Sequence, residues 1–141
     1  MAIERGGNAM DAAVAAVLDG YPIATRERLL RLRELIIETA ASTAGVGALE
    51  ETLKWGQVSY LTPQSGSGTT VRIDVDKASG QPAIYVNCQT NLVDEYRQIY
   101  PEAFAYQGTR AVVIGDAPDE AALRHVIAQA LTYHLRKKRV V

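Results

Sequence analysis

The sequence predicts an α+β domain in which an antiparallel sheet of about four strands packs against N-terminal and C-terminal helices. Three observations lead to this prediction. Apolar residues recur at helical spacing between residues 29 and 40, and they alternate with polar residues between 71 and 75. The strand-like segments also form a consecutive block, which is typical of an antiparallel sheet, whereas regular alternation with helices would indicate a parallel one.

Length and composition are those of one globular domain. The chain has 141 residues, of which 48% are hydrophobic and 22% charged. Fifteen basic residues against sixteen acidic ones give a net charge of −1, which disfavours a broad nucleic-acid face. The longest apolar segment, residues 12–18, is too short to span a bilayer. We therefore expect a cytoplasmic protein whose partner is neither a nucleic acid nor a membrane; a homodimer is compatible with the sequence.

The N-terminal segment divides into an arm and a first helix. Residues 1–9 contain few apolar side chains, so we expect a disordered arm followed by one domain over 10–141. The alanine-rich run of residues 10–18 favours a helix. Gly20, Tyr21 and Pro22 then end that helix.

A longer second helix is predicted from Thr25, whose hydroxyl is a suitable N-cap. Its apolar stripe recurs at steps of three and four residues through Leu29, Leu32, Ile36 and Ala40. Arginines and glutamates alternate over the other faces, which indicates a solvated surface. After two glycines, residues 49–53 are predicted to form only about one turn of helix.

The middle of the chain changes to a period of two. We predict short strands at 58–61, 71–75 and 83–88, the last two joined as a hairpin through the turn at 77–80. The glycine-rich and serine-rich residues 62–68 between the first two strands are expected to form a mobile loop.

The last third alternates between helix and strand. We predict a helix capped by Thr90 or Asn91 that Pro101 ends, and a short strand at 110–114. The final helix is expected to begin after Asp116 or Ala117. Its buried face is predicted to contain Leu123, Ile127, Ala130, Leu131 and His134. Four basic residues at 136–139 suit the negative end of that helix.

Groups with catalytic or metal-binding chemistry are few. His125 and His134 are nine residues apart in sequence, about 13 Å of helix rise, so they cannot share one ion. Cys88 is the only cysteine, which excludes a disulfide within the chain and a cysteine cluster for a metal. Its predicted strand face is shared with Ile84 and Val86, so a buried thiol is favoured over a nucleophile. The dinucleotide-binding and phosphate-loop motifs are absent, and we predict no cofactor and no metal.

Aromatic side chains are the most distinctive feature, with seven tyrosines, one tryptophan and one phenylalanine. Such rings line small-ligand clefts, and they also fill ordinary cores, which is the interpretation we favour for Trp55 and Tyr60. The candidate cleft consists of Trp55, Gly56, Tyr60, Tyr85, Cys88, Tyr96 and Arg110.

The segment Trp55-Gly56-x-x-x-Tyr60, preceded by Glu50 and Glu51, resembles the YdhG-like family of domains of unknown function. The resemblance covers residues 29–135 and has a second anchor at Gly108-Thr109-Arg110, which a strand and a final helix follow. The family pattern has Met and Pro where this chain has Gln57 and Val58.

The resemblance implies little about activity, because most members of the family have none assigned; some relatives are described as frataxin-like iron chaperones. We expect a non-catalytic domain that binds a small ligand or a protein partner. An iron chaperone is one alternative, and an enzyme that depends on Cys88 is another.

Overall fold

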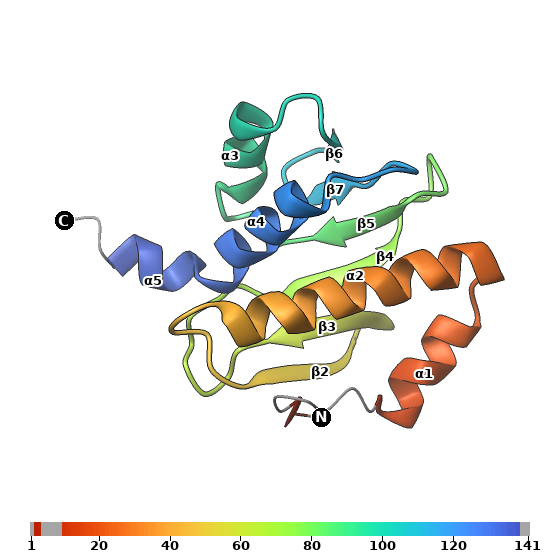
Figure 1. Cartoon of the computed structure of the whole chain (residues 1–141), viewed down its shortest axis with the longest axis horizontal. Helices are drawn as coiled ribbons and strands as arrows, with labels where there is room; N and C mark the ends of the chain where they lie inside the picture. The colour runs from red at the N-terminus through yellow and green to blue at the C-terminus, as the bar shows by residue number, and fades with distance from the viewer. Residues whose placement is uncertain (1, 4–9, 139–141) are drawn as a thin grey trace.

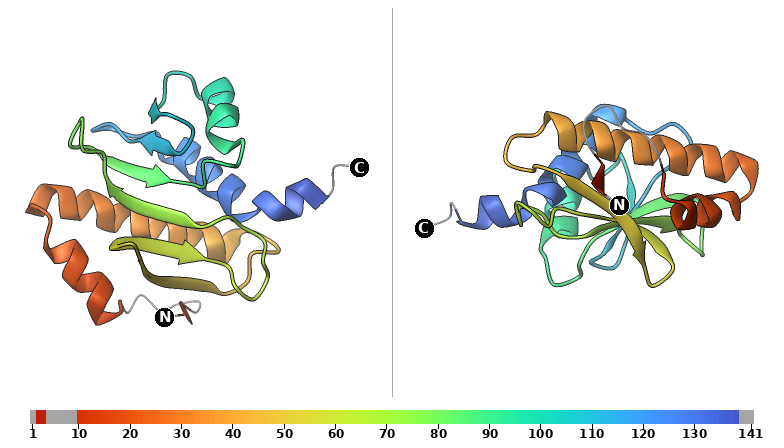
Figure 2. Two further views of the ribbon diagram at one scale, coloured as in Figure 1. Left: turned by 180° about the vertical axis from the view of Figure 1, so that it is seen from behind. Right: turned by 90° about the horizontal axis from the view of Figure 1, so that it is seen from below.

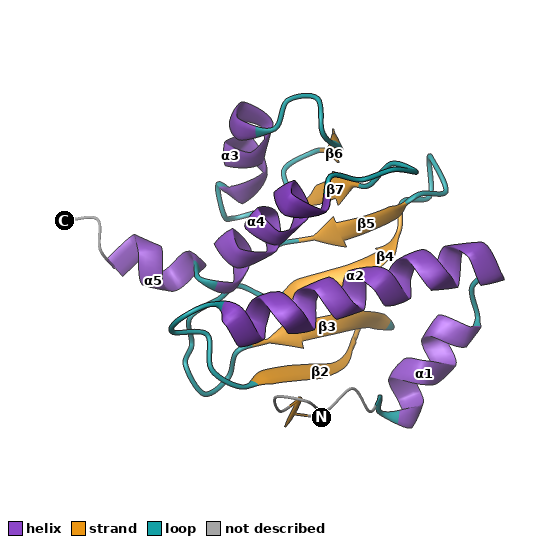
Figure 3. Ribbon diagram, in the orientation of Figure 1, coloured by secondary structure: helices purple, strands orange, loops and turns teal. Residues whose placement is uncertain are grey.

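The computed structural model describes residues 2–3 and 10–138 and contains one antiparallel sheet with helices against it (Figure 1). Within those residues the sheet has seven strands in the order β1-β2-β3-β4-β5-β7-β6. Helices α2 and α4 lie side by side across one face of the sheet (Figures 1 and 3). The predicted α+β class is confirmed, but the sheet is larger than the four strands expected.

The elements have the following bounds. The strands are β1 (Ala2–Ile3), β2 (Leu49–Lys54), β3 (Gln57–Leu61), β4 (Val71–Val75), β5 (Pro82–Tyr85), β6 (Ala105–Gln107) and β7 (Ala111–Val113). The helices are α1 (Ala12–Asp19), α2 (Ile23–Ser42), α3 (Leu92–Ile99), α4 (Glu120–Leu131) and α5 (Tyr133–Lys138). Of the predicted arm, Ala2–Ile3 pairs with β2 and the remainder lies outside the described residues.

Besides β1, the strands β2 and β6 were not predicted, and β5 ends at Tyr85 instead of residue 88. The segment Leu49–Lys54 is a strand instead of a turn of helix, and its inward-facing Glu51 is fully buried. A glutamate in the middle of the buried face hides the alternation that would have identified the strand. Strand β6 was not predicted because it is only three residues long and its Ala105 and Gln107 are exposed.

The helix ends also differ. Helix α2 begins at Ile23 after Pro22, two residues before the predicted cap. Asp119, not Asp116 or Ala117, caps α4, because its carboxylate accepts a 3.1 Å hydrogen bond from the amide of Ala122.

The predicted final helix is interrupted at Thr132, between α4 and α5. The interruption changes which side chains face inward: Tyr133 is buried, whereas His134, predicted to be buried, is exposed.

The predicted mobile loop is held against the junction of α4 and α5. The Ser67 hydroxyl donates a 2.7 Å hydrogen bond to the carbonyl of Leu131, and the Ser67 carbonyl accepts one of 2.8 Å from the amide of His134. A Cβ added to Gly68 would lie 2.7 Å from backbone atoms of Leu131. Glycine and serine are present here because the loop backbone approaches the helix closely, not because the loop is free.

The core lies between the sheet and the pair α2 and α4, and it encloses one ionic group. Arg33 of α2 and Glu51 of β2 form a buried ion pair with contacts of 2.7 and 3.1 Å. The Tyr60 hydroxyl donates a 2.8 Å hydrogen bond to the same carboxylate. Burial and the charge of Glu51 raise the pKa of Tyr60 well above its ordinary value, so the phenol stays a neutral donor.

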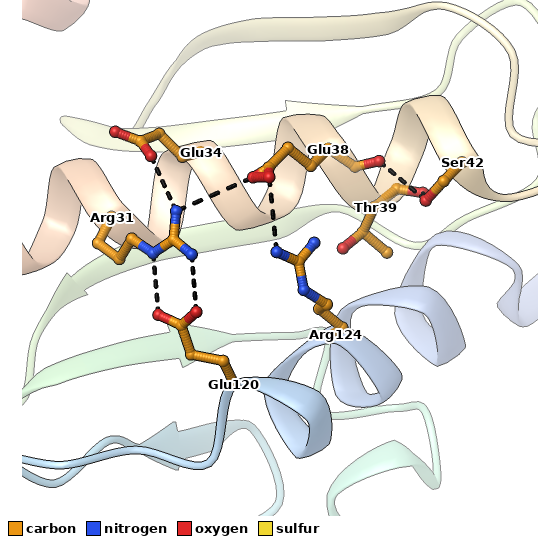
Figure 4. A network of polar contacts seen from close by, with 7 residues as sticks. All are labelled: Arg31, Glu34, Glu38, Thr39, Ser42, Glu120 and Arg124. Atoms are coloured by element: carbon orange, nitrogen blue, oxygen red, sulfur yellow. Dashed lines mark hydrogen bonds and ion pairs between the residues drawn. The ribbon is translucent and has the colours of Figure 1, made fainter.

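A second ionic network joins the outer surfaces of α2 and α4 (Figure 4). Arg31 contacts Glu34 at 2.9 Å and Glu120 at 2.7 Å, and Arg124 of α4 contacts Glu38 at 3.5 Å. The Arg31–Glu34 contact is the i, i+3 pair that the alternating charges of α2 predicted. The other two ion pairs connect α2 to α4, so we assign the network to the packing of the two helices. Each exposed pair contributes little to the free energy of unfolding by itself. The predicted solvated surface is wrong for Arg33, which is buried.

Candidate functional site: the open face of the sheet

The second face of the sheet is not covered by α2 or α4. Seen from behind, β3, β4 and β5 lie in front of those helices, while α1 and α3 lie at the margins (Figure 2, left). Cross-strand register places Arg72, Asp74, Tyr85 and Ala111 on this side, because their neighbours Val71, Ile73, Ile84 and Val112 belong to the core. We call this surface the open face.

Two adjoining hollows occupy the open face. The large hollow has a volume of about 440 Å³ and is lined by residues from β3 to β7, among them Gln57, Asp74, Tyr85 and Gln107. The small hollow, of about 250 Å³, is lined by Thr69, Thr70, Asn87 and Cys88. Arg72 and Arg110 line both. The large hollow is within the size range of small-molecule sites.

The two arginines flank Tyr85. Arg72 pairs with Tyr85 across β4 and β5, and Tyr85 pairs with Ala111 across β5 and β7. Arg110 directly precedes Ala111, and its carbonyl accepts a 2.8 Å hydrogen bond from the amide of Val86. With strands about 4.8 Å apart, the two arginine Cα atoms are on the order of 10 Å apart. Long side chains at this spacing can reach one anionic group between them.

The acids of the open face are already engaged within the chain. The Asp74 carboxylate accepts hydrogen bonds from the Tyr21 hydroxyl at 2.5 Å, the Gln57 amide at 2.8 Å and the Val75 backbone at 2.7 Å. Burial raises the pKa of Asp74, but these hydrogen bonds outweigh it and hold that pKa below its ordinary value. Asp76 accepts from both the amide and the hydroxyl of Ser79, at 3.0 and 2.6 Å.

The arginines, in contrast, have no such partners. Among the described residues, no hydrogen bond or ion pair involves the side chain of Arg72 or Arg110, and the Nε of Arg72 is buried without a hydrogen-bond acceptor. A buried donor without an acceptor is costly. Burial and the charges of Asp76 and Asp74 raise the pKa of Tyr85, with Arg110 opposing, so its hydroxyl remains a neutral donor. The open face therefore presents hydrogen-bond donors and two arginine charges that have no carboxylate partner among the described residues.

The structure separates the predicted cleft residues into three places. Tyr85, Cys88 and Arg110 line the hollows of the open face. Tyr60 and Tyr96 lie on the other side of the sheet, in the core, where the Tyr96 hydroxyl donates a 2.7 Å hydrogen bond to the carbonyl of Val126. Trp55 and Gly56 form the turn between β2 and β3.

Two of these residues have the opposite exposure to that favoured by the sequence. Trp55 is 92% exposed instead of buried, because it occupies the tip of a hairpin. Cys88 is exposed instead of buried beside Ile84 and Val86, because β5 ends at Tyr85 and a turn begins at Asn87.

Arg72 was missed as a site residue. In the sequence it is one of the polar positions that alternate with Val71 and Ile73, and such positions are normally solvated. Pairing residues 71–75 with 83–88 across the predicted hairpin would have put Arg72 on the face of Tyr85, so cross-strand pairing was the signal that could have found it.

The described residues contain no cluster of three or more His, Cys, Asp or Glu side chains that could hold a metal ion. His125 is partly buried and contacts the Tyr100 hydroxyl at 2.8 Å and the Gln129 amide at 3.1 Å. No helix in the described part of the chain has the length and apolarity needed to cross a membrane.

Comparisons of the chain with protein families, with curated proteins and with solved structures found no match. The resemblance to the YdhG-like family therefore stays a prediction from the residues around Trp55 and Arg110.

Proposed function

We propose that this chain is a non-catalytic binding domain and that the open face of its sheet binds a small organic anion. Arg72 and Arg110 hold the anionic group, a carboxylate or a phosphate, and the Tyr85 hydroxyl donates a further hydrogen bond. The observation that supports the proposal best is that Arg72 and Arg110 line both hollows while neither guanidinium has a hydrogen-bond acceptor among the described residues, although two acids lie on the same face. An anion supplies that acceptor, and arginine matches carboxylate and phosphate geometry well.

The acids of the open face support an anion over a cation. Asp74 accepts three hydrogen bonds from the chain itself and Asp76 accepts two, which leaves fewer lone pairs for a metal or an amine. An iron chaperone and an enzyme that depends on Cys88 gain no comparable support: the residues that line the small hollow include no histidine to activate the thiol.

The test is ligand binding by titration calorimetry and thermal unfolding, with ribose 5-phosphate and succinate as anions and neutral ribose as the control. At least one anion is expected to bind and to raise the unfolding midpoint, and ribose is not. Arg72→Gln or Arg110→Gln removes charge-assisted hydrogen bonds of about 1.5–3 kcal/mol, which weakens binding by about 10-fold to 100-fold.

Arg124→Gln is the matched control variant, because it removes the same charge from the helical side of the molecule, where Arg124 faces Glu38. Cys88 offers an independent readout, since an anion on Arg72 and Arg110, which also line the small hollow, should slow alkylation of this exposed thiol. The proposal fails if neither anion binds, or if Arg124→Gln weakens binding as much as Arg72→Gln.

A further inference from the structure

The tip of the β2–β3 hairpin has a conformation that its first residue does not favour. Trp55 and Gly56 both have positive φ angles, of 55° and 76°. Two-residue hairpin turns with this backbone prefer Asn-Gly, because an asparagine tolerates positive φ while a bulky side chain is strained there. The ring of Trp55 is also 92% exposed. Within the described chain, neither the backbone nor packing explains a tryptophan at this position.

The hairpin tip lies at one end of the large hollow. Seen from below, the tip of β2 and β3 extends to the side of the sheet opposite α2, which is the side of the open face (Figure 2, right). Gln57, the first residue of β3 after the turn, lines the large hollow and donates its amide to Asp74. Trp55 is therefore two residues along the chain from Gln57, which forms part of the wall of the proposed anion site.

The register gives the backbone separation between Trp55 and Arg72, the nearer of the two arginines. Along β4, Asp74 is two residues beyond Arg72, and Gln57 lies beside Asp74. Trp55 is two further residues along the hairpin. At about 3.3 Å per residue, Trp55 lies on the order of 10–13 Å from Arg72. An anion as long as a nucleoside monophosphate reaches from one to the other.

We infer that Trp55 is a stacking platform for a planar ring at the far end of the anionic ligand. This inference rests on the proposed function and adds the ligand class: an organic phosphate or carboxylate that carries an aromatic ring and extends from Arg72 toward Trp55. The exposure of Trp55 leaves its indole open for a ring to stack on. Its strained backbone also fits, because strain at an otherwise unexplained position is common in binding sites.

Adenosine 5′-monophosphate and ribose 5-phosphate form the matched ligand pair, because they share the sugar phosphate and differ in the ring. We expect the former to bind about tenfold more tightly to the wild-type chain and to quench the fluorescence of its single tryptophan. Trp55→Asn should abolish that tenfold advantage while leaving the affinity for ribose 5-phosphate unchanged. Trp55→Phe should retain most of it.

The variant Trp55→Asn is suited to this test because Asn-Gly is the preferred turn sequence, so its unfolding midpoint should not fall. If both ligands bind with equal affinity, or if Trp55→Asn leaves the tenfold ratio intact, the stacking inference is wrong and the anion site stands. If neither ligand binds while succinate does, the stacking inference is again wrong. If no anion binds at all, the proposed function fails and the stacking inference fails with it.

Discussion

The buried pair of Arg33 and Glu51 gives the sharpest prediction about stability. We expect Glu51→Gln to destabilise the fold strongly, although it changes the size of the side chain very little. Arg33 is 4% exposed and Glu51 is fully buried, so the guanidinium cannot turn to water when the carboxylate is neutralised. The substitution removes the charged acceptor of two hydrogen bonds from Arg33 and of one from Tyr60.

The size of the effect follows from burial. Neutralising one partner of a buried pair costs about 3–5 kcal/mol, because the other charge stays desolvated. Tyr60→Phe removes a single hydrogen bond to the carboxylate and should cost less, about 1.5–3 kcal/mol. Replacing both charges at once, as Arg33→Met with Glu51→Leu, should cost less than Glu51→Gln alone, because no uncompensated charge remains.

Urea unfolding followed by far-ultraviolet circular dichroism measures these free energies. Tryptophan fluorescence is a poor probe here, since the only tryptophan is already 92% exposed in the folded chain. A loss of under about 1 kcal/mol for Glu51→Gln would refute the reasoning, since it would mean that water or another group solvates Arg33. A double replacement less stable than Glu51→Gln would contradict the account of the uncompensated charge.

Two further predictions concern the open face and the loop. Because the folded pKa of Asp74 is lowered, its ionised form stabilises the fold above its unfolded pKa of about 4. Asp74→Asn should therefore destabilise the chain at pH 7, and the difference from the wild type should shrink as pH falls through the folded pKa, measured by urea unfolding between pH 3 and 7. Gly68→Ala should cost about 1–3 kcal/mol, because its Cβ meets the backbone of Leu131. Gly66→Ala is the control, because its Cβ would meet open space and only its φ of +63° is unfavourable. It should cost less, about 1 kcal/mol of unfolding free energy. Equal losses for the two variants would show that the contact of residue 68 with Leu131 is not tight.

Elements with a clear local period were predictable. The stripe of α2 and the alternation of β4 each depend on the side chains of one segment, so the sequence alone locates them. Strand β2 was missed because its buried Glu51 is matched by Arg33, 18 residues earlier and in another element. A pairing of that kind is a property of the fold, and no local pattern contains it.

The site was predictable only in part, for a related reason. Tyr85, Cys88 and Arg110 were named, but hydrophobicity suggested a core position for Trp55 and for Cys88. Backbone conformation decides both positions instead: a hairpin turn exposes Trp55, and the end of β5 exposes Cys88. Arg72 became a site residue only when cross-strand register put it opposite Tyr85.

On one face of the sheet the buried arginine is paired with a carboxylate, and on the other face the arginines are not. This difference assigns the first face to stability and the second to binding. On the helical face the buried Arg33 has a carboxylate, supplied by a distant strand. On the open face, Asp74 is only two residues from Arg72 along β4. Its oxygens nevertheless accept hydrogen bonds from Tyr21, Gln57 and the backbone. A fold that needed Arg72 only for stability would gain by pairing it with that acid. Variants of the Arg33 pair should therefore change the free energy of unfolding, whereas Arg72→Gln should change anion affinity and leave stability nearly unaltered.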